Sequence, residues 1–225
     1  MSHYKRSVQH IRAVLRGLPA EIQVVAAAKT RTPDEVRAAV EAGVFAVGHN
    51  YVQEAEKMAA AFSQEDAVPS THMIGHVQRN KAARAVRLFD MIQTVDSLQL
   101  ADRLSRECSA IGKTLPILVE VNSGREPRKS GIQLEEAEDF VRALSALPSL
   151  QVEGLMTMGP AVDTPDRLRP YFRETRRLLD ALARQQIPRV HMSVLSMGMS
   201  ASYAVALEEG ATMIRLGTAL FGPRP

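Results

Sequence analysis

A single lysine at the end of an apolar run is the residue in this sequence that is best placed for covalent chemistry. Lys29 directly follows five apolar residues at 24–28. A primary amine held beside apolar residues can attack the carbonyl carbon of an aldehyde or ketone. The simpler interpretation of this position alone is a lysine that reaches from the end of a strand into water. Its position therefore leaves two interpretations open.

Two segments in the last thirty residues have the composition of phosphate-binding loops. Residues 196–200 read SMGMS and residues 215–218 read RLGT, and a helix is predicted to begin after each of them. Small residues let the backbone come close to an anion, and the free N–H groups at a helix start can bind it. The alternative is two ordinary loops with helix caps. The presence of both segments in neighbouring units favours a phosphate site.

Arg215 lies within an apolar run that is predicted to form a strand. Because side chains alternate along a strand, Arg215 points away from its neighbours Ile214 and Leu216, and we expect it to face the interior. A guanidinium in that place needs a hydrogen-bond acceptor. A cofactor ring nitrogen would serve, and so would an internal carboxylate.

Four polar residues at predicted strand ends form no metal-binding pattern. His49, Asn50, His72 and His76 lack the spacing of zinc ligands, so we predict no metal site. The sequence also has no Gly-x-Gly-x-x-Gly after its first predicted strand, no Gly-x-Ser-x-Gly and no Walker lysine motif. Nucleotide binding and serine hydrolysis are therefore disfavoured.

The elements that must position these groups are short β-type runs that alternate with amphipathic helical segments. Such alternation indicates parallel strands joined by helical crossovers, and eight units are the number that closes a (β/α)8 TIM barrel. A doubly wound open sheet is the alternative, because it shows the same alternation. The predicted strands cover 24–29, 45–50, 72–76, 91–95, 117–122, 152–158, 191–196 and 213–217.

The helix boundaries carry their own signals. Thr32, Pro33 and Glu35 form a capping box with proline at the first helical position, so a helix is predicted to begin directly after the Lys29 loop. Gly43 can take the left-handed conformation that ends it. An extra N-terminal helix over 4–16 precedes the first strand, and we expect it to cover the bottom of the barrel.

Composition and charge favour one cytoplasmic domain over residues 1–225, of which 45% are hydrophobic and 24% charged. The densest basic cluster, Arg125, Arg128 and Lys129, has no aromatic residues interleaved, which argues against nucleic acid and suits a phosphate-sized anion better. No run approaches the roughly 18 apolar residues that span a bilayer, so we predict no membrane association. A single cysteine, Cys108, indicates a reducing compartment. No long exposed apolar seam is evident, which favours a monomer.

Taken together, these segments resemble the pyridoxal phosphate homeostasis protein family, whose members are single barrels similar to the N-terminal domain of alanine racemase. The resemblance runs through almost the whole chain. The segments that carry it are AKT at 28–30, GHNYVQE at 48–54, HMIGHVQRNK at 72–81, VN at 121–122, KSG at 129–131, GLMTM at 154–158, SMGMS at 196–200 and RLGTALFG at 215–222.

The resemblance implies that pyridoxal 5'-phosphate (PLP) is held as a Schiff base on Lys29. Ser200 and the backbone amides of Gly217 and Thr218 would bind its phosphate, and Arg215 would face the pyridine nitrogen. An arginine there makes the cofactor a weaker electron sink than a carboxylate would. The full set of cofactor-binding residues expected from the resemblance is Lys29, Asn50, His72, Met156, Ser196, Ser200, Arg215, Gly217 and Thr218, with Asn50, His72 and Met156 lining the ring pocket.

Three positions depart from the usual family pattern. His49 stands where a glutamate is typical, His76 where a proline often follows Ile-Gly, and Ser202 where an acidic residue often follows Met-Ser-x. These departures affect polar contacts that we expect at the rim of the pocket, and they fit a divergent paralogue with altered ligand preference.

The resemblance implies a protein that binds, buffers and delivers PLP, with apo PLP-dependent enzymes as recipients. Racemases of similar fold take a second base from a C-terminal β domain, whereas this sequence ends at Pro225, so we expect little or no turnover. The alternative is a PLP-dependent amino-acid racemase or related enzyme. A third interpretation is a barrel enzyme that binds a phosphate ester without PLP.

Overall fold

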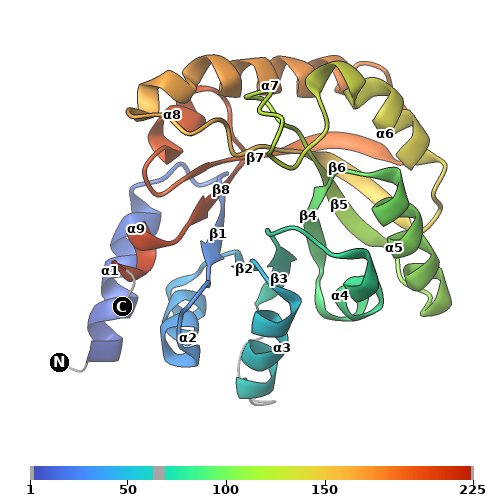
Figure 1. Ribbon diagram of the computed structural model, residues 1–225. Coiled ribbons are helices and arrows are strands. Elements are labelled where there is room, and N and C mark those ends of the chain that lie inside the picture. The colour runs from blue at the N-terminus through green and yellow to red at the C-terminus, as the bar shows by residue number, and fades with distance from the viewer. Residues whose placement is uncertain (1–2, 63–68, 224–225) are drawn as a thin grey trace.

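The protein is a ring of parallel strands closed on itself and surrounded by helices (Figure 1). The computed structural model describes residues 3–62 and 69–223. Within these residues each of the eight strands pairs with the next one in sequence, and the first pairs with the last, Val25 lying beside Arg215. Closure confirms the barrel and rules out the doubly wound open sheet.

The strands lie close to the predicted ones but end at different residues. The prediction for 91–95 is correct to the residue, and the others differ by one to three residues at one or both ends. Lys29, His76, Met158 and Gly217 consequently lie in loops after the strands that were predicted to contain them. The strands are β1 (Gln23–Ala27), β2 (Ala46–His49), β3 (Ser70–Met73), β4 (Met91–Val95), β5 (Leu115–Glu120), β6 (Leu150–Met156), β7 (Val190–Met199) and β8 (Met213–Leu216).

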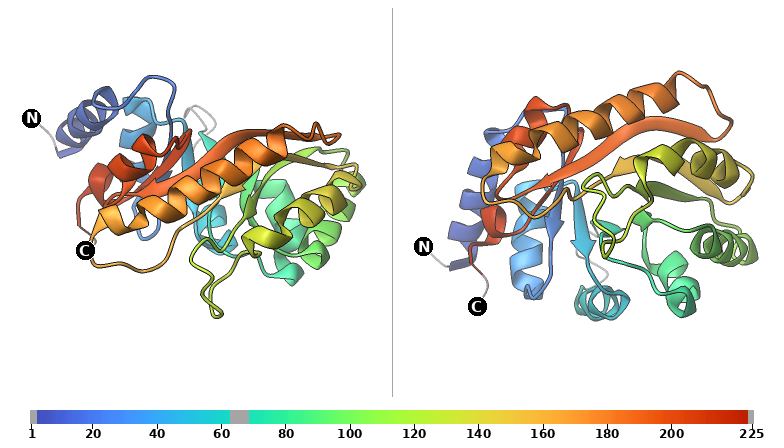
Figure 2. Two further views of the ribbon diagram at one scale, coloured as in Figure 1. Left: turned by 90° about the horizontal axis from the view of Figure 1, so that it is seen from above. Right: turned by 45° about the horizontal axis from the view of Figure 1, so that its top comes forward.

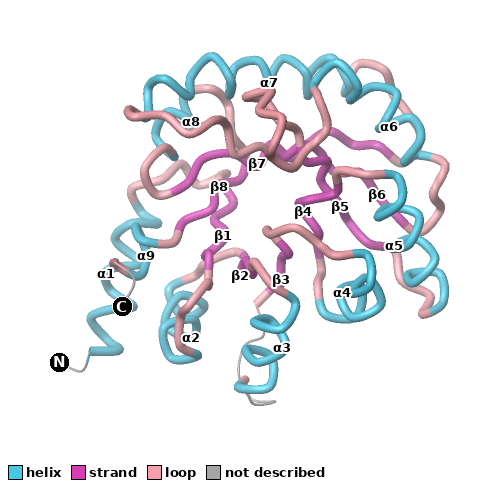
Figure 3. Tube along the Cα trace, in the orientation of Figure 1, coloured by secondary structure: helices cyan, strands magenta, loops and turns pink. Residues whose placement is uncertain are grey.

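Helices fill the outer layer, and Figure 3 shows them around the inner ring of strands. Three short 3-10 turns, Arg79–Lys81, Leu134–Glu136 and Pro165–Leu168, precede longer helices. The α-helices are α1 (His3–Arg16), α2 (Pro33–Ala42), α3 (Val52–Ala61), α4 (Ala82–Leu88), α5 (Leu98–Ala110), α6 (Ala137–Ser145), α7 (Arg169–Ala183), α8 (Tyr203–Glu208) and α9 (Thr218–Phe221).

The N-terminal helix is present, but the expectation that it covers the bottom of the barrel is wrong. Helix α1 lies at the side of the molecule, against α2 and α9 (Figures 1 and 2). Its buried residues Val8 and Ile11 face these helices, and the His10 imidazole Nε2 lies 3.0 Å from the carbonyl oxygen of Ala219. An apolar stripe on α1 is thus buried against neighbouring helices rather than against strand ends.

The helix that follows the Lys29 loop begins and ends as its sequence predicts. The Thr32 hydroxyl accepts a hydrogen bond from the Glu35 amide, and the Glu35 carboxylate accepts one from the Thr32 amide. Pro33 occupies the first helical position, and Gly43 closes α2 with φ +100°. The direction in which the chain leaves β1 is therefore set within a few residues of Lys29.

The two faces of the strands meet different surroundings. Outward-facing side chains pack against the helices in a large apolar core, in which Phe89 and Phe172 are fully buried. Burying a side chain of that size contributes about 1.5–3 kcal/mol. Inside the ring, a small apolar cluster of Val25, Ala46 and Met213 gives way to buried polar groups. The barrel interior can therefore present polar atoms to its mouth.

Among the described residues, no helix combines the length and the apolar character needed to cross a lipid bilayer.

Candidate functional site

The loop after β1 carries Lys29 at the carboxyl end of the barrel. Lys29 is partly buried, and its Nζ lies 5.5 Å from the centre of the Tyr51 ring. Thr30 has φ +66°, a left-handed conformation that residues other than glycine seldom adopt, and the Arg31 amide donates to the Ala28 carbonyl 2.9 Å away. Such local strain is often retained at functional sites. The tight turn places Lys29 at the barrel mouth, where its side chain is partly buried and not fully extended into solvent.

A cavity of about 380 Å³ opens beside this lysine. We call it the mouth cavity. Pockets of this size and larger hold small-molecule ligands. Six of the predicted residues line it. Arg215 lies in β8, and the other five follow β1, β2, β7 or β8: Lys29, Asn50, Ser200, Gly217 and Thr218.

Sequence reasoning missed the apolar part of the same cavity. Met158 and Met199 line it and are 47% and 39% exposed, although methionine is usually buried. Ile74, Ala27 and Ala201 complete the wall. Met158 and Met199 both belong to segments that carry the family resemblance, GLMTM at 154–158 and SMGMS at 196–200, and those motifs were the signal that the sequence offered.

Backbone amides from the loop after β8 converge on one hydroxyl. Ser200 Oγ accepts hydrogen bonds from the amides of Gly217, at 3.0 Å, and Ala219, at 3.1 Å. Ser200 itself follows β7 in a turn that Ser202 fastens, because the Ser202 hydroxyl accepts a hydrogen bond from the Met199 amide. An oxygen acceptor at this point is what such donors require, and a phosphate oxygen has the same character.

Arg215 faces the interior as predicted and is 5% exposed. Its Nη1 donates to Ser196 Oγ at 2.6 Å and its Nη2 to the Thr157 carbonyl at 3.0 Å. Burial lowers the pKa of Arg215 to about 10, and the charge of Glu120 opposes the shift. The guanidinium therefore stays protonated at neutral pH. Within the described part of the chain Arg215 forms no direct ion pair. The internal carboxylate that the sequence left open as its partner is thus absent from direct contact, and Glu120 acts on Arg215 only through its charge.

Three of the predicted residues do not line the mouth cavity. His72, Met156 and Ser196 are each 2% exposed or less and lie in the barrel interior. The His72 Nδ1 atom lies 2.9 Å from Nε2 of Gln93, a buried residue that the sequence did not single out. Alternation along a strand predicts which side chains point inward, but it does not predict their depth.

The atypical histidines also lie away from the cavity. His49 points outward from β2 with its ring centre 6.4 Å from that of Phe89, and burial lowers its pKa to about 4. His76 is exposed. In the residues that the structure describes, no three histidine, cysteine, aspartate or glutamate side chains are grouped so as to hold a metal ion.

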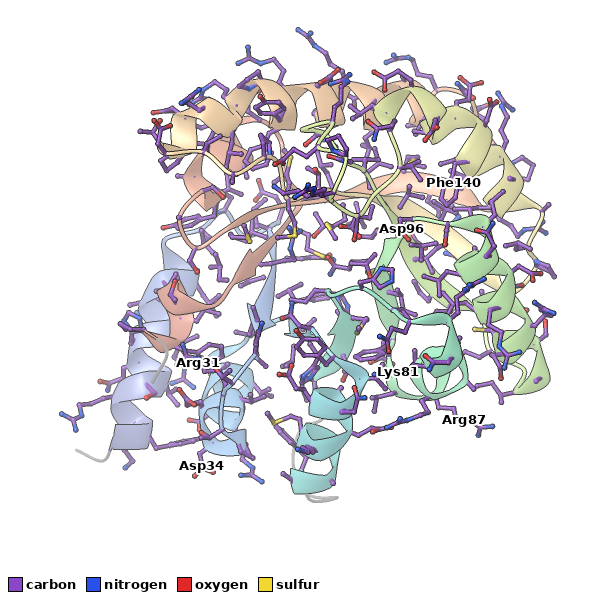
Figure 4. The ribbon with its side chains drawn as sticks, in the orientation of Figure 1. Arg31, Asp34, Lys81, Arg87, Asp96 and Phe140 are labelled. Carbon is purple, nitrogen blue, oxygen red and sulfur yellow. The ribbon has the colours of Figure 1, made fainter. Side chains whose placement is uncertain are left out.

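A second cavity of about 310 Å³ adjoins the first, and Met158 lines both. Arg128 and Lys129 line it, although Lys129 is already paired with Glu126. Glu120 lines its buried side. Burial, followed by the charge of Asp96, raises the pKa of Glu120 to about 7, whereas Arg215 acts in the opposite direction. Figure 4 labels Asp96, which directly follows β4.

Comparison with known proteins decides the family. A family model described as the N-terminal domain of alanine racemase matches residues 2–225. The pyridoxal phosphate homeostasis protein of Pasteurella multocida is 33% identical over 224 residues, which are 100% of this chain and 96% of that protein. The chain belongs to the pyridoxal phosphate homeostasis protein family. The protein of the same name from Escherichia coli K12 is 36% identical over 92% of this chain and 87% of that one, so the resemblance predicted from the sequence is confirmed.

Solved structures agree with this assignment. PipY of Synechococcus elongatus, in a structure with PLP bound, superposes with a TM-score of 0.87 at 34% identity, covering 96% of this chain and 100% of that one. Alanine racemase of Clostridium difficile has a TM-score of 0.78 at 16% identity and covers 99% of this chain but 57% of that one. At that identity the racemase shares the fold alone, and this confirms the predicted fold class.

Proposed function

We propose that this protein binds PLP covalently through Lys29 and serves to hold and release it rather than to turn over a substrate. One observation carries the proposal: an amine from the loop after β1 lines the same cavity as a buried guanidinium from β8 and backbone amides from the loop that follows β8. These are the partners that an aldehyde, a phosphate and a ring nitrogen require. The PLP-bound PipY structure and the names of the relatives support the same cofactor.

The loop after β8 suits the cofactor's anionic end, because a phosphate oxygen could take the place of the Ser200 hydroxyl as acceptor for its amides. Ser200 Oγ already marks a point at which the amides of Gly217 and Ala219 meet, so these amides are oriented before any ligand arrives. Thr218 lies between them and also lines the cavity. We infer that this loop would hold the phosphate.

PLP supplies an aldehyde that condenses with primary amines and a ring that can withdraw electrons. Arg215 limits the second property. A guanidinium with a pKa of about 10 donates hydrogen bonds but does not readily give up a proton to a ring nitrogen at neutral pH. A cofactor held against it would remain a poor electron sink, which favours storage over catalysis.

The covalent step can be tested by trapping. Purified protein is incubated with PLP, scanned for a visible absorption band, reduced with borohydride and digested for mass spectrometry. We expect the label on Lys29, and none in Lys29→Ala. Lys57→Ala is the matched control, because Lys57 is an exposed lysine on α3. A label confined to Lys81 or Lys129, or no label, would refute the proposal.

Enzymatic and storage roles differ in proton exchange at the α-carbon of amino acids. A carrier should exchange deuterium far more slowly than about 1 s⁻¹, the lower end of ordinary enzyme turnover, whereas a racemase or related enzyme should reach it. Delivery is tested separately by adding loaded protein to an apo PLP-dependent enzyme and following the recovery of its activity. Transfer faster than spontaneous release into buffer would support a delivery role, and equal rates would leave storage alone.

A further inference from the structure

A chain of buried hydrogen bonds leads from the mouth cavity into the barrel. It starts at Arg215, whose Nη1 lies 2.6 Å from Ser196 Oγ. Ser196 Oγ lies 2.7 Å from Gln93 Oε1, and Gln93 Nε2 lies 2.9 Å from His72 Nδ1. The four side chains come from β8, β7, β4 and β3, so the chain joins strands on opposite sides of the ring.

Elementary chemistry fixes the direction of every bond in this chain. A guanidinium only donates, so the Ser196 hydroxyl must accept from Arg215 and is left with its own proton to give. That proton goes to an acceptor, which makes the atom of Gln93 facing Ser196 the carbonyl oxygen. The amide nitrogen of Gln93 then faces His72 and donates to Nδ1. His72 must consequently carry its proton on Nε2.

The surroundings agree with this order. Gln93 Nε2 also lies 3.2 Å from the sulfur of Met213, which can accept but not donate. Gln93 and Ser196 are fully buried, and His72 is 2% exposed, so water cannot easily replace a missing partner. Burial lowers the pKa of His72 to about 4 against the opposing charge of Asp90, which leaves Nδ1 free to accept at neutral pH.

We propose that Gln93, Ser196 and His72 are positioning residues that hold the guanidinium of Arg215 in the wall of the mouth cavity through a hydrogen-bond chain of fixed direction. The value of this position for a bound ring rests on the proposed function. The chain itself does not, because it exists without ligand. Its cross-barrel anchoring explains why Arg215 keeps its place although no carboxylate among the described residues pairs with it directly.

The first test uses the ligand-free protein and needs no substitution. Long-range ¹H–¹⁵N correlation spectra report which imidazole nitrogen carries the proton. We expect His72 to be neutral at pH 6 with the proton on Nε2. A proton on Nδ1, or a doubly protonated ring at that pH, would mean that Gln93 is reversed, and the directed chain would be refuted whether or not PLP binds.

The second test measures the bound cofactor. Ser196→Ala removes the hydrogen bonds of Ser196 to Arg215 and Gln93, and Gln93→Leu removes those of Gln93 to Ser196 and His72. Because these bonds position Arg215 and do not touch the ligand, we expect PLP to bind roughly fivefold more weakly, the factor that one neutral hydrogen bond to the ligand would represent. Its absorption maximum should shift as well, because the charge beside the ring moves. Ser196→Thr keeps the hydroxyl and should restore the spectrum.

Ser149→Ala is the matched control, since it removes a hydroxyl paired with Ser109 Oγ at 2.7 Å outside the barrel interior. If Ser196→Ala and Ser149→Ala leave the affinity and the spectrum equally unchanged, Ser196 has no positioning role. If the wild type binds no PLP, the proposed function fails and the His72 tautomer still decides the inference.

Discussion

Arg31 ties the loop that carries Lys29 to the last described residues of the chain. Its side chain is 4% exposed and lies between α2 and α9 (Figure 4). The guanidinium donates to Glu35 Oε1 at 3.1 Å and to the carbonyls of Gly222, at 2.7 Å, and Pro223, at 3.3 Å. One side chain thus fastens the loop after β1 to the segment that follows the proposed phosphate loop.

Replacing Arg31 with alanine should cost both stability and cofactor affinity. A hydrogen bond to a charged group contributes about 1.5–3 kcal/mol, but water can reach some of the carbonyls once the side chain is gone. We therefore expect the free energy of unfolding to fall by about 2–4 kcal/mol, which corresponds to about 5–15 °C in the melting midpoint for a chain of this length. Arg31→Lys keeps the charge but loses the planar guanidinium, so its free energy of unfolding should lie between those of the wild type and Arg31→Ala.

The assay is thermal and urea unfolding of the ligand-free protein, followed by PLP titration at a temperature where both variants are folded. Arg167→Ala is the control, because Arg167 forms an i,i+4 pair with Asp163 that is 67% and 70% exposed. Its midpoint should match that of the wild type. If Arg31→Ala has the same melting midpoint as Arg167→Ala and binds PLP as the wild type does, the hydrogen bonds of Arg31 contribute nothing to stability, and the reasoning from burial and geometry is wrong.

Three further predictions concern other parts of the barrel. Gly75→Ala would place a Cβ within 2.8 Å of the Asn50 Cα, so we expect a loss of about 1–3 kcal/mol and weaker PLP binding, whereas Gly17→Ala, with 3.4 Å to its nearest neighbour, should change neither. Burial raises the pKa of Glu120 from 4.5 to about 7, so the folded state binds more protons than the unfolded state between these pH values. The free energy of unfolding should therefore fall by about 3 kcal/mol as the pH rises from 4.5 to above 7. A flat pH profile in the wild type, or the same profile in Glu120→Gln, would contradict this. Burial also raises the pKa of the Cys108 thiol, so a thiol reagent should modify it only as fast as the protein unfolds.

Local signals in the sequence predicted local structure well. The capping box at Thr32 and Glu35 and the glycine at position 43 operate over a few residues, and the structure shows all of these contacts. The inward direction of Arg215 followed from alternation along one strand in the same way. Counting eight strand–helix units favoured a closed ring but left the open sheet as an alternative, because both show the same alternation, and only the pairing of β1 with β8 decides between them.

Depth inside the barrel could not be predicted, because it depends on the stagger between neighbouring strands. His72 and Met156 were expected to line the cofactor ring, yet neither lines the mouth cavity. Gln93 reads as one polar residue in an ordinary strand, and only the pairing of four strands shows that it links Ser196 to His72. The position of α1 was missed for a similar reason, since an apolar stripe does not say which partner will cover it.

The pairing of β1 with β8 also dictates when the mouth cavity can form during synthesis. Once the loop after β1 has been translated, Lys29 is part of the nascent chain, but Ser200 and Gly217 have yet to be added. The nascent chain therefore carries the reactive amine for most of its elongation without the loops that would retain a phosphate. Under the proposed function, the chain can retain PLP only after the final strand has been made, and a prematurely stopped chain would contain Lys29 without the loops proposed to hold the phosphate.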